Sequence, residues 1–368
     1  MTAMWPDRRI LDLFGIELPI LQAPMAGAVL AEMAVAVAEA GGLGALPAAL
    51  LDAEGFRTQF GRIRQRTGRP INVNFFCHRR PEPDPAREMA WKARLAPYYR
   101  ELGLDPAAPT PAGHRAPFDA GFCGLVEELR PEVVSFHFGL PDPGLLDRVR
   151  ATGAKIVSSA TTVDEAVWLE ERGCDAIIAQ GFEAGGHRGM FLADRVEAQV
   201  GTLALVPQVV DAVAVPVIAA GGIADGRGIA AAFALGAAAA QVGTAYLFCP
   251  EATIADLHRE ALHDAARRAT ALTNVFTGRP ARGILNRVMR EVGPMASDAP
   301  AFPLAGGALA PLRAAAEPAG SDDFMSLWSG QSAALGRAMP AAALTRALAA
   351  EALAVLGRMS MESGGRQE

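Results

Sequence analysis

The segment AQGFEAGGHRG, residues 179–189, carries the residues best suited to chemistry in this chain. Gln180 ends an apolar run, and its side-chain amide can both donate and accept hydrogen bonds. His187 follows the glycine pair Gly185-Gly186, in a segment expected to form a flexible loop. An imidazole titrates near neutral pH and can act as a general acid or base. A lone histidine is more often structural or merely exposed, but its place beyond a strand end favours a catalytic role.

Two glycine-containing turns further along the chain have the features of a phosphate site. Gly221-Gly222 and Gly243-Thr244 each follow an apolar run, and a helical pattern follows the first of them. Backbone N–H groups at such turns attract anions, and a helix N-terminus adds a favourable dipole. Either pair alone could simply make a tight turn. Two pairs after successive strands favour phosphate binding.

Three other apolar runs carry weaker signals. In VVSFHFG, alternation places Ser135 and His137 on one face, where His137 is equally well explained as a core histidine or as a substrate contact. In INVNFF, Asn72 and Asn74 share a face and could bind the edge of a heterocycle. The turn around Pro24 is small and poor in N–H groups, so a planar ring could lie on it.

These residues all follow short apolar runs that recur along the first two thirds of the chain. Such near-continuous apolar runs are typical of strands buried on both faces, and helical patterns separate them. We expect an α/β fold, a (β/α)8 TIM barrel over residues 10–250, with the functional groups at the C-terminal ends of the strands. The expected strands are Pro19–Met25, Gly42–Pro47, Ile71–Phe76, Val133–Gly139, Lys155–Ala160, Ala176–Gly181, Pro216–Gly222 and Ala239–Leu247.

Two segments depart from this period. Residues 79–130 form a proline-rich insertion, in which we expect one helix near Arg87–Leu102 and a role as lid or pocket wall. Residues 251–368 lack the strand pattern, and we expect a smaller, mostly helical second domain that covers the barrel mouth. Its expected helices are Pro250–Arg268, Ser321–Met339 and Ala341–Arg358.

Composition excludes several classes of protein. Hydrophobic residues make up 51% of the 368 residues, so a large core can form and global disorder is excluded. Lys and Arg number 34 and Asp and Glu 40, a net charge of −6 that gives no footprint for nucleic acid or an anionic membrane. The four cysteines match no metal or disulfide pattern. Without a signal peptide or an apolar span, a cytoplasmic protein is expected. The sequence leaves the oligomeric state open, with a homodimer as the candidate.

Taken together, the motifs QAPM, INVNFF, SFHFG, SSATT, AQGFEAGGHRG, AAGGI, QVGTA and WSGQ resemble those of class I nitronate monooxygenases, formerly called 2-nitropropane dioxygenases. The resemblance runs from about Ile16 to the C-terminal helix. AQGFEAGGHRG is highly specific, whereas QAPM and AAGGI are shared more widely among barrels that bind FMN. The resemblance implies an FMN-binding barrel with a smaller second domain and no metal.

The resemblance also implies roles for individual residues. His187 matches the catalytic histidine of the family, and His137 a histidine of the substrate cavity. Ser135 shares a strand face with His137, so we expect both side chains to bind the substrate. The implied cofactor-binding residues are Ala23, Pro24, Met25, Asn74, Gln180, Gly185, Gly186, Gly221, Gly222, Gln241, Val242, Gly243, Thr244, Ser329, Gly330 and Gln331. One segment departs from the family: residues 299–310 contain no Tyr and no Lys, where family members place aromatic and basic side chains in the substrate cavity.

The implied activity is FMN-dependent oxidation of alkyl nitronates, or of neutral nitroalkanes, by O₂ to carbonyl compounds and nitrite. An alternative on the same barrel is an NAD(P)H-dependent quinone or enoyl-thioester reductase. Reduction of the flavin by NADH without O₂ would favour it. An alternative of another class is a flavin-binding protein without turnover, which would bind FMN yet neither consume O₂ nor oxidise NADH.

Overall fold

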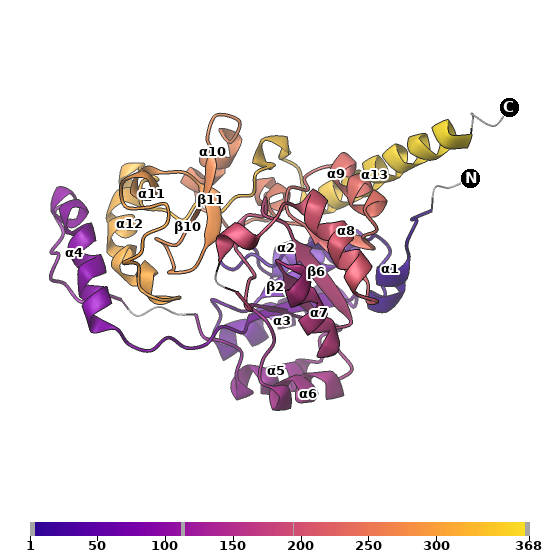
Figure 1. Cartoon of the computed structure of the whole chain (residues 1–368), viewed down its shortest axis with the longest axis horizontal. Helices are drawn as coiled ribbons and strands as arrows, with labels where there is room; N and C mark the ends of the chain where they lie inside the picture. The colour runs from indigo at the N-terminus through magenta and orange to yellow at the C-terminus, as the bar shows by residue number, and fades with distance from the viewer. Residues whose placement is uncertain (1–3, 112–114, 194, 365–368) are drawn as a thin grey trace.

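The computed structural model describes residues 4–111, 115–193 and 195–364 and contains the expected barrel (Figure 1). Eight parallel strands follow the order β1-β9-β8-β6-β5-β4-β3-β2. A parallel bridge between Leu21 and Leu43 joins the first strand to the segment before β2 and closes the sheet. The strands are β1 (Ile20–Gln22), β2 (Gly44–Pro47), β3 (Ile71–Phe76), β4 (Val133–His137), β5 (Lys155–Ala160), β6 (Ala176–Gln180), β8 (Val217–Ala220) and β9 (Ala239–Val242).

Several strands end earlier than their apolar runs predict. The run that was expected to continue to Leu247 leaves the sheet at Val242, and Thr244–Phe248 form a short 3₁₀ helix, η2. Gly221 and Gly222 have φ of 110° and 71°, which takes them out of the extended conformation. The apolar pattern of a sequence depends on which residues are buried and not on which backbone groups pair in a sheet. It therefore does not distinguish a strand from a buried turn that follows it.

The barrel helices start where the sequence supplies a capping side chain. The Asp52, Asp119 and Thr162 side chains accept hydrogen bonds from backbone N–H groups in the first turns of α3, α5 and α7. The helices around the barrel are α2 (Ala31–Glu39), α3 (Ala53–Arg66), α5 (Ala120–Leu129), α6 (Pro143–Ala151), α7 (Val163–Glu171), α8 (Thr202–Ala212, preceded by η1, Val196–Ala198) and α9 (Gly226–Ala234).

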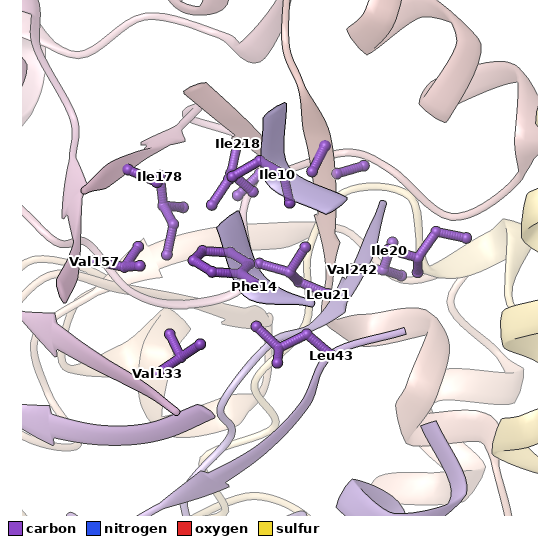
Figure 2. Packing of buried hydrophobic residues seen from close by; sticks show 14 of the residues in the cluster. Ile10, Phe14, Ile20, Leu21, Leu43, Val133, Val157, Ile178, Ile218 and Val242 are labelled. Carbon is purple, nitrogen blue, oxygen red and sulfur yellow. The ribbon is translucent and has the colours of Figure 1, made fainter. Parts of the chain in front are cut away.

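The barrel core includes residues from outside the barrel strands. Helix α1 (Arg9–Phe14) contributes Ile10 and Phe14, which are almost fully buried. Figure 2 shows Phe14 beside Leu21 and close to Leu43 and Val157, so this helix packs directly on the strands. The N-terminal helix therefore belongs to the barrel.

The remainder of the chain forms a second layer around a small antiparallel sheet. Strand β11 (Ala281–Ile284) pairs with β10 (Thr270–Thr273) on one side and with β7 (Gly186–His187) on the other. The predicted helix over Ser321–Met339 is wrong, because this segment consists of turns and the short η5 (Ala333–Leu335). The helices of this layer are α10 (Asp256–His263), α11 (Arg287–Glu291), η3 (Leu304–Ala308), α12 (Ala310–Ala316) and η4 (Glu317–Ala319).

Two helices pack differently from their expected domains. Helix α4 (Pro85–Glu101), from the insertion, buries Trp91, Leu95 and Tyr99 in the cluster that contains residues of α11 and α12, and it lies beside those helices in Figure 1. Helix α13 (Ala341–Gly364) packs on α9 and α2, against the barrel wall. We infer a division in which α4 joins the second layer and α13 joins the barrel, in place of the expected spans 10–250 and 251–368. None of the helices in the described ranges is both long and apolar enough to cross a bilayer.

Candidate active site

A cavity of about 340 Å³ opens at the C-terminal ends of the barrel strands, within the size range of small-molecule sites. Its wall combines strand-end turns of the barrel with the second layer. Most of the site residues predicted from the sequence line it: Ala23, Pro24, Met25, Asn74, His137, Gln180, Gly185, Gly186, His187, Gly221, Gly222, Gln241, Gly243, Thr244, Ser329 and Gly330.

His187 lies in strand β7, so the expectation of a flexible loop was wrong. Its register partner is Ala281 of β11, and Gly186 before it has φ of 69°, a conformation that favours glycine. The His187 Nε2 atom lies 3.0 Å from the Thr277 hydroxyl oxygen, and that hydroxyl donates to the Arg279 carbonyl at 3.3 Å. Because the hydroxyl proton is used there, Nε2 is the nitrogen that donates to Thr277. The lone pair is therefore on Nδ1, which has no partner in the described part of the chain.

The environment of His187 keeps it neutral. Burial is the largest cause, and nearby Arg115, His137 and Arg279 add to it, so the pKa of His187 lies well below 6.5. Aromatic rings surround the imidazole: the Phe302 ring centroid is 5.3 Å away and that of Trp328 is 5.5 Å away. A neutral imidazole with a free lone pair can accept a proton. In this state His187 adds no positive charge to the cavity.

His137 supports His187 as well as lining the cavity. Its Nδ1 lies 2.6 Å from the Ser159 hydroxyl, and its Nε2 lies 3.2 Å from the His187 carbonyl oxygen. Only a nitrogen that carries a proton can donate to that carbonyl, so Nε2 is protonated and Nδ1 accepts from Ser159. Burial is the main cause that lowers the pKa of His137 to about 3. The sequence allowed His137 to be a core histidine or a substrate contact. Both ring nitrogens have hydrogen-bond partners, as in a core histidine, and the side chain also lines the cavity.

Gln180 holds the segment that carries His187. Its Nε2 donates to the His187 carbonyl at 3.0 Å, and its Oε1 accepts from the Gly189 N–H at 2.8 Å. The neighbouring Arg188 is fully buried and donates to the carbonyls of Gln180 and Gly181. The Gln180 amide was expected to hydrogen-bond the flavin. In the structure both of its polar atoms hold residues 187–189 in place.

The amides of β3 divide between the cavity and the core. Asn74 lines the cavity, and its Nδ2 donates to the Ser135 hydroxyl at 2.9 Å and to the Ser135 carbonyl at 3.2 Å. Ser135 itself is buried and does not line the cavity, so the structure places it behind Asn74 and not against a substrate. Asn72 is likewise buried away from the cavity.

The glycine turns after β8 and β9 face the cavity, but the helix after β8 does not present free N–H groups there. The Asp225 carboxylate caps α9 by accepting from Arg227 N–H at 3.0 Å and Gly228 N–H at 3.2 Å, and Gly226 N–H donates to Glu351. The N-terminus of α9 therefore has its N–H groups bonded to carboxylates of the protein and does not offer them to a phosphate, contrary to the expectation from the sequence. Within the described residues, the N–H groups of Gly222 and Thr244 have no acceptor.

The Gly221-Gly222 turn is held from behind. The Thr202 hydroxyl lies 2.9 Å from the Gly221 carbonyl, and the Glu183 carboxylate accepts from Thr202 N–H at 2.8 Å. Ser332 donates to the Gly222 carbonyl at 2.6 Å. A Cβ atom at Gly221 would lie 3.0 Å from Thr202 Oγ1 and 3.1 Å from the Ala184 nitrogen, and the φ of 110° would strain any side chain at this position.

The segment around Ser329 reaches the cavity from the second layer. The Gly330 N–H donates to the Thr244 hydroxyl at 2.9 Å, which joins this segment to the turn after β9. Gln331 is exposed and does not line the cavity, although its N–H donates to the Glu183 carbonyl at 3.0 Å. Val242 is also outside the cavity lining, since it is buried in the sheet. These two residues can therefore support the site only from behind the cavity wall.

Sequence reasoning missed several residues that line or support the cavity. Arg115, from the insertion, lines it, and so do Trp328 and Ser332; Thr277 orients His187. None of the three tyrosines lines it: Tyr98 and Tyr99 pack in the second layer, and Tyr246 is buried against Thr345. One hint of this is present in the sequence: residues 299–310 contain no Tyr and no Lys. Polar side chains of the cavity therefore had to come from other segments.

Comparison with known proteins agrees with this geometry. The profile of the family described as nitronate monooxygenase matches residues 7–351. A nitronate monooxygenase from Pseudomonas aeruginosa is 43% identical over 345 residues, which cover 93% of this chain and 98% of that protein. The crystal structure of a nitroalkane oxidase from Streptomyces ansochromogenes superposes with a TM-score of 0.85 at 41% identity, over 96% of this chain and 99% of that one.

A second solved structure is a more distant likeness. The structure of FabK from Thermotoga maritima covers 98% of this chain and 100% of that one with a TM-score of 0.71, but at 27% identity. The higher identity and TM-score both lie with the nitronate and nitroalkane enzymes. The chain therefore belongs to the nitronate monooxygenase family, whose members are flavin-dependent oxidoreductases that act on nitronates.

Proposed function

We propose that the chain binds FMN in this cavity and uses O₂ to oxidise alkyl nitronates to carbonyl compounds and nitrite. The observation that carries the proposal is the position of His187: a neutral imidazole with a free Nδ1 lines the same cavity as the two glycine turns. A proton acceptor beside a cofactor cradle suits a substrate that reacts as a carbanion equivalent.

The cavity has the unsatisfied polar groups that a flavin mononucleotide requires. Among the residues that the structure describes, the buried Gln241 Oε1 atom has no hydrogen-bond partner, and the N–H groups of Gly222 and Thr244 have no acceptor. An N–H-lined turn suits one terminal phosphate, and a buried amide oxygen suits an N–H or O–H donor of the cofactor. The small residues Ala23 and Pro24 leave room for a planar ring. We assign the phosphate to the turns after β8 and β9.

The side chains divide the remaining work. FMN, when bound, would supply the electron-accepting and oxygen-reacting chemistry. Thr277 holds Nε2 of His187, so Nδ1 is the atom that would take the α-proton of a neutral nitroalkane. Phe76 and Trp328 line the cavity beside His187 and limit the water around it. The Arg115 guanidinium supplies positive charge for an anionic substrate, which a neutral His187 cannot do.

The experiment is a titration of the purified, FMN-loaded protein with propionate 3-nitronate while the flavin spectrum, O₂ uptake and nitrite are followed. We expect O₂ consumption and nitrite that both depend on the nitronate. Flavin reduction by NADH in the absence of O₂, with no nitrite from nitronates, would favour the reductase. Bound FMN with neither reaction would favour a binding protein.

A further inference from the structure

Arg279 brings a partly buried cation close to the active site from the second layer. It lies in the turn between β10 and β11, two residues after Thr277, and it is not part of the cavity lining. Burial lowers its pKa to about 10, so the guanidinium is still charged at neutral pH. No carboxylate of the described residues lies within ion-pair distance of it, and its buried Nε–H has no acceptor there. A cation in this position costs stability, which points to a role at the site.

Phe138 connects this cation to the histidines. The Arg279 Cζ atom lies 4.0 Å from the centroid of the Phe138 ring, which is the geometry of a cation–π contact. The centroid of the same ring is 4.5 Å from that of His137 and 6.1 Å from that of His187. Phe138 has φ of 72°, a left-handed conformation that is strained for a bulky residue. The surrounding structure therefore holds this ring in place against its backbone preference.

One peptide unit joins Arg279 to a buried carboxylate of the barrel. The Arg279 guanidinium donates to the Met190 carbonyl, and the N–H of the same peptide unit, that of Phe191, donates to Glu165 Oε1 at 2.6 Å. Glu165, in α7, also accepts from the N–H and the hydroxyl of Thr161, each at 2.7 Å. The carboxylate is thus occupied by neutral donors and reaches the guanidinium only through the peptide unit. Arg279 is held in place, but its charge is not cancelled by direct contact.

The charged and titratable groups around His187 come from several segments, and among the described residues none of those that shift its pKa is a carboxylate. Burial is the largest cause of its low pKa, followed by Arg115 of the insertion, His137 of β4, Arg279, and His78 after β3. The other side chains against the ring are uncharged: Phe76, Phe138, Thr277, Phe302 and Trp328. Arg115 lines the cavity, where an anionic substrate can offset its charge, whereas Arg279 lies outside the lining and keeps its charge throughout.

We propose that Arg279 is a positioning residue for the base: held over Phe138 and bonded to the Met190 carbonyl, its fixed charge keeps the His187 imidazole unprotonated. This rests on the proposed function, in which Nδ1 takes the α-proton of a neutral nitroalkane. In that step the C–H bond breaks, its electron pair stays on the substrate as the nitronate, and the proton forms a bond with Nδ1. Without the charge of Arg279, solvent protons would occupy Nδ1 in mild acid and block the step.

The first test measures the protonation of the ring directly. Histidine labelled with nitrogen-15 in the FMN-loaded protein reports by NMR whether each imidazole nitrogen carries a proton, and the His187 signals are those lost in His187→Asn. Arg279→Gln removes the charge but keeps an N–H donor for the Met190 carbonyl, whereas Arg279→Lys keeps the charge.

The proposal predicts a difference between these variants from pH 8 to pH 5. We expect His187 to stay neutral in the wild type and in Arg279→Lys, and to become protonated by pH 5 in Arg279→Gln. The pKa of His187 should rise by about one unit or more in Arg279→Gln, the shift that a unit charge several ångströms away produces at the effective dielectric constant of a protein interior.

The second test follows proton abstraction from neutral nitroethane. In Arg279→Gln, kcat/KM relative to wild type should change less than about threefold at pH 8 and fall by up to about 10-fold towards pH 5, since one unit of pKa changes the neutral fraction of a base tenfold. Arg279→Lys should follow the wild-type profile. A purely structural role for Arg279 would lower the ratio by the same factor at every pH and leave the NMR signals of His187 unchanged.

Arg287→Gln is the matched control. Arg287 also lies over a ring of the second layer, that of Tyr98, but it pairs with Glu101 and is not among the groups that shift the pKa of His187. Its variant should leave the NMR signals and the pH profile unchanged. A neutral His187 at pH 5 in Arg279→Gln, or identical behaviour of the Gln and Lys variants, would overturn the proposal. The expected NMR shift in a protein that oxidises no nitroalkane would reject the proposed function and retain Arg279 as the group that keeps His187 neutral.

Discussion

The Nε2 atom of His187 lies 3.0 Å from the hydroxyl of Thr277, a residue 90 positions further along the chain. This contact crosses from β7 to the turn before β11, so it fixes the imidazole through the second layer and not through the barrel. The pairing decides which nitrogen carries the lone pair. An imidazole held in this way keeps its Nδ1 ready to accept a proton.

Removal of the Thr277 hydroxyl tests this relationship. Thr277→Val keeps the shape of the side chain but leaves the Nε2–H of His187 without an acceptor. We expect kcat for a neutral nitroalkane to fall about 5- to 10-fold, equivalent to one neutral hydrogen bond of about 1–1.5 kcal/mol. Thr277→Ser retains the hydroxyl and should restore the rate. Equal activity of the Val and Ser variants would show that the contact does not orient the base.

The phosphate assignment predicts the effect of Gly222→Asp. A carboxylate would enter a turn whose free N–H is expected to meet a phosphate, at a residue with φ of 71°. We expect loss of FMN from a folded chain, measured by flavin content and circular dichroism. Gly320→Asp is the matched control, because Gly320 has φ of 78°, open space around its Cβ position and no part in the cavity. If both variants retain FMN equally, the phosphate lies elsewhere.

Buried neutral histidines predict a loss of stability in mild acid. Burial is the main cause that lowers the pKa of His78 and His258 to about 4 and that of His137 to about 3. In the unfolded chain these groups titrate near 6.5, so below that pH the unfolded state binds more protons and the free energy of unfolding falls as pH falls. Each such histidine contributes a slope of up to about 1.4 kcal/mol per pH unit.

This slope can be measured by urea unfolding with saturating FMN at pH 7, 6 and 5. The carboxylates remain mostly ionised over this range, so the histidines dominate the change. His258→Gln keeps a donor for the Trp328 carbonyl and should reduce the slope by up to the contribution of one histidine. A free energy of unfolding that stays constant from pH 7 to pH 5 would contradict the neutral, buried state of these rings.

The sequence identified the barrel because strand and turn signals are local. Apolar runs located all eight barrel strands, and Gly221-Gly222 marked a turn whose positive φ only glycine readily adopts. Contacts such as His187 with Thr277 join distant segments and leave no periodic signal. Helix α13 is rich in alanine, so its sequence does not show which face packs on the barrel wall. Arg115 lies in residues 115–119, which form neither helix nor strand, so no periodic pattern marked it as a residue of the cavity wall.

The role of His187 as a base makes the sharpest functional prediction. Asn at position 187 keeps a polar group of similar reach but cannot take a proton near neutral pH. A neutral nitroalkane needs its α-carbon deprotonated, and general-base help contributes about 10²- to 10⁴-fold. The preformed nitronate has already lost that proton. His187→Asn should therefore reduce kcat/KM for nitroalkanes far more than for nitronates, once flavin content is matched.

The low pKa of His187 sharpens this test. Burial keeps the imidazole unprotonated in wild type, so its basic form persists from pH 8 down to at least pH 6.5. Over that range kcat/KM for the neutral nitroalkane should show no loss from protonation of His187, and the mutant-to-wild-type ratio should stay constant. A wild-type rate that falls with an apparent pKa near 7 would mean that His187 carries a proton there and binds the substrate as a cation. Equal losses on nitroalkane and nitronate would likewise assign it to charge stabilisation in place of proton transfer.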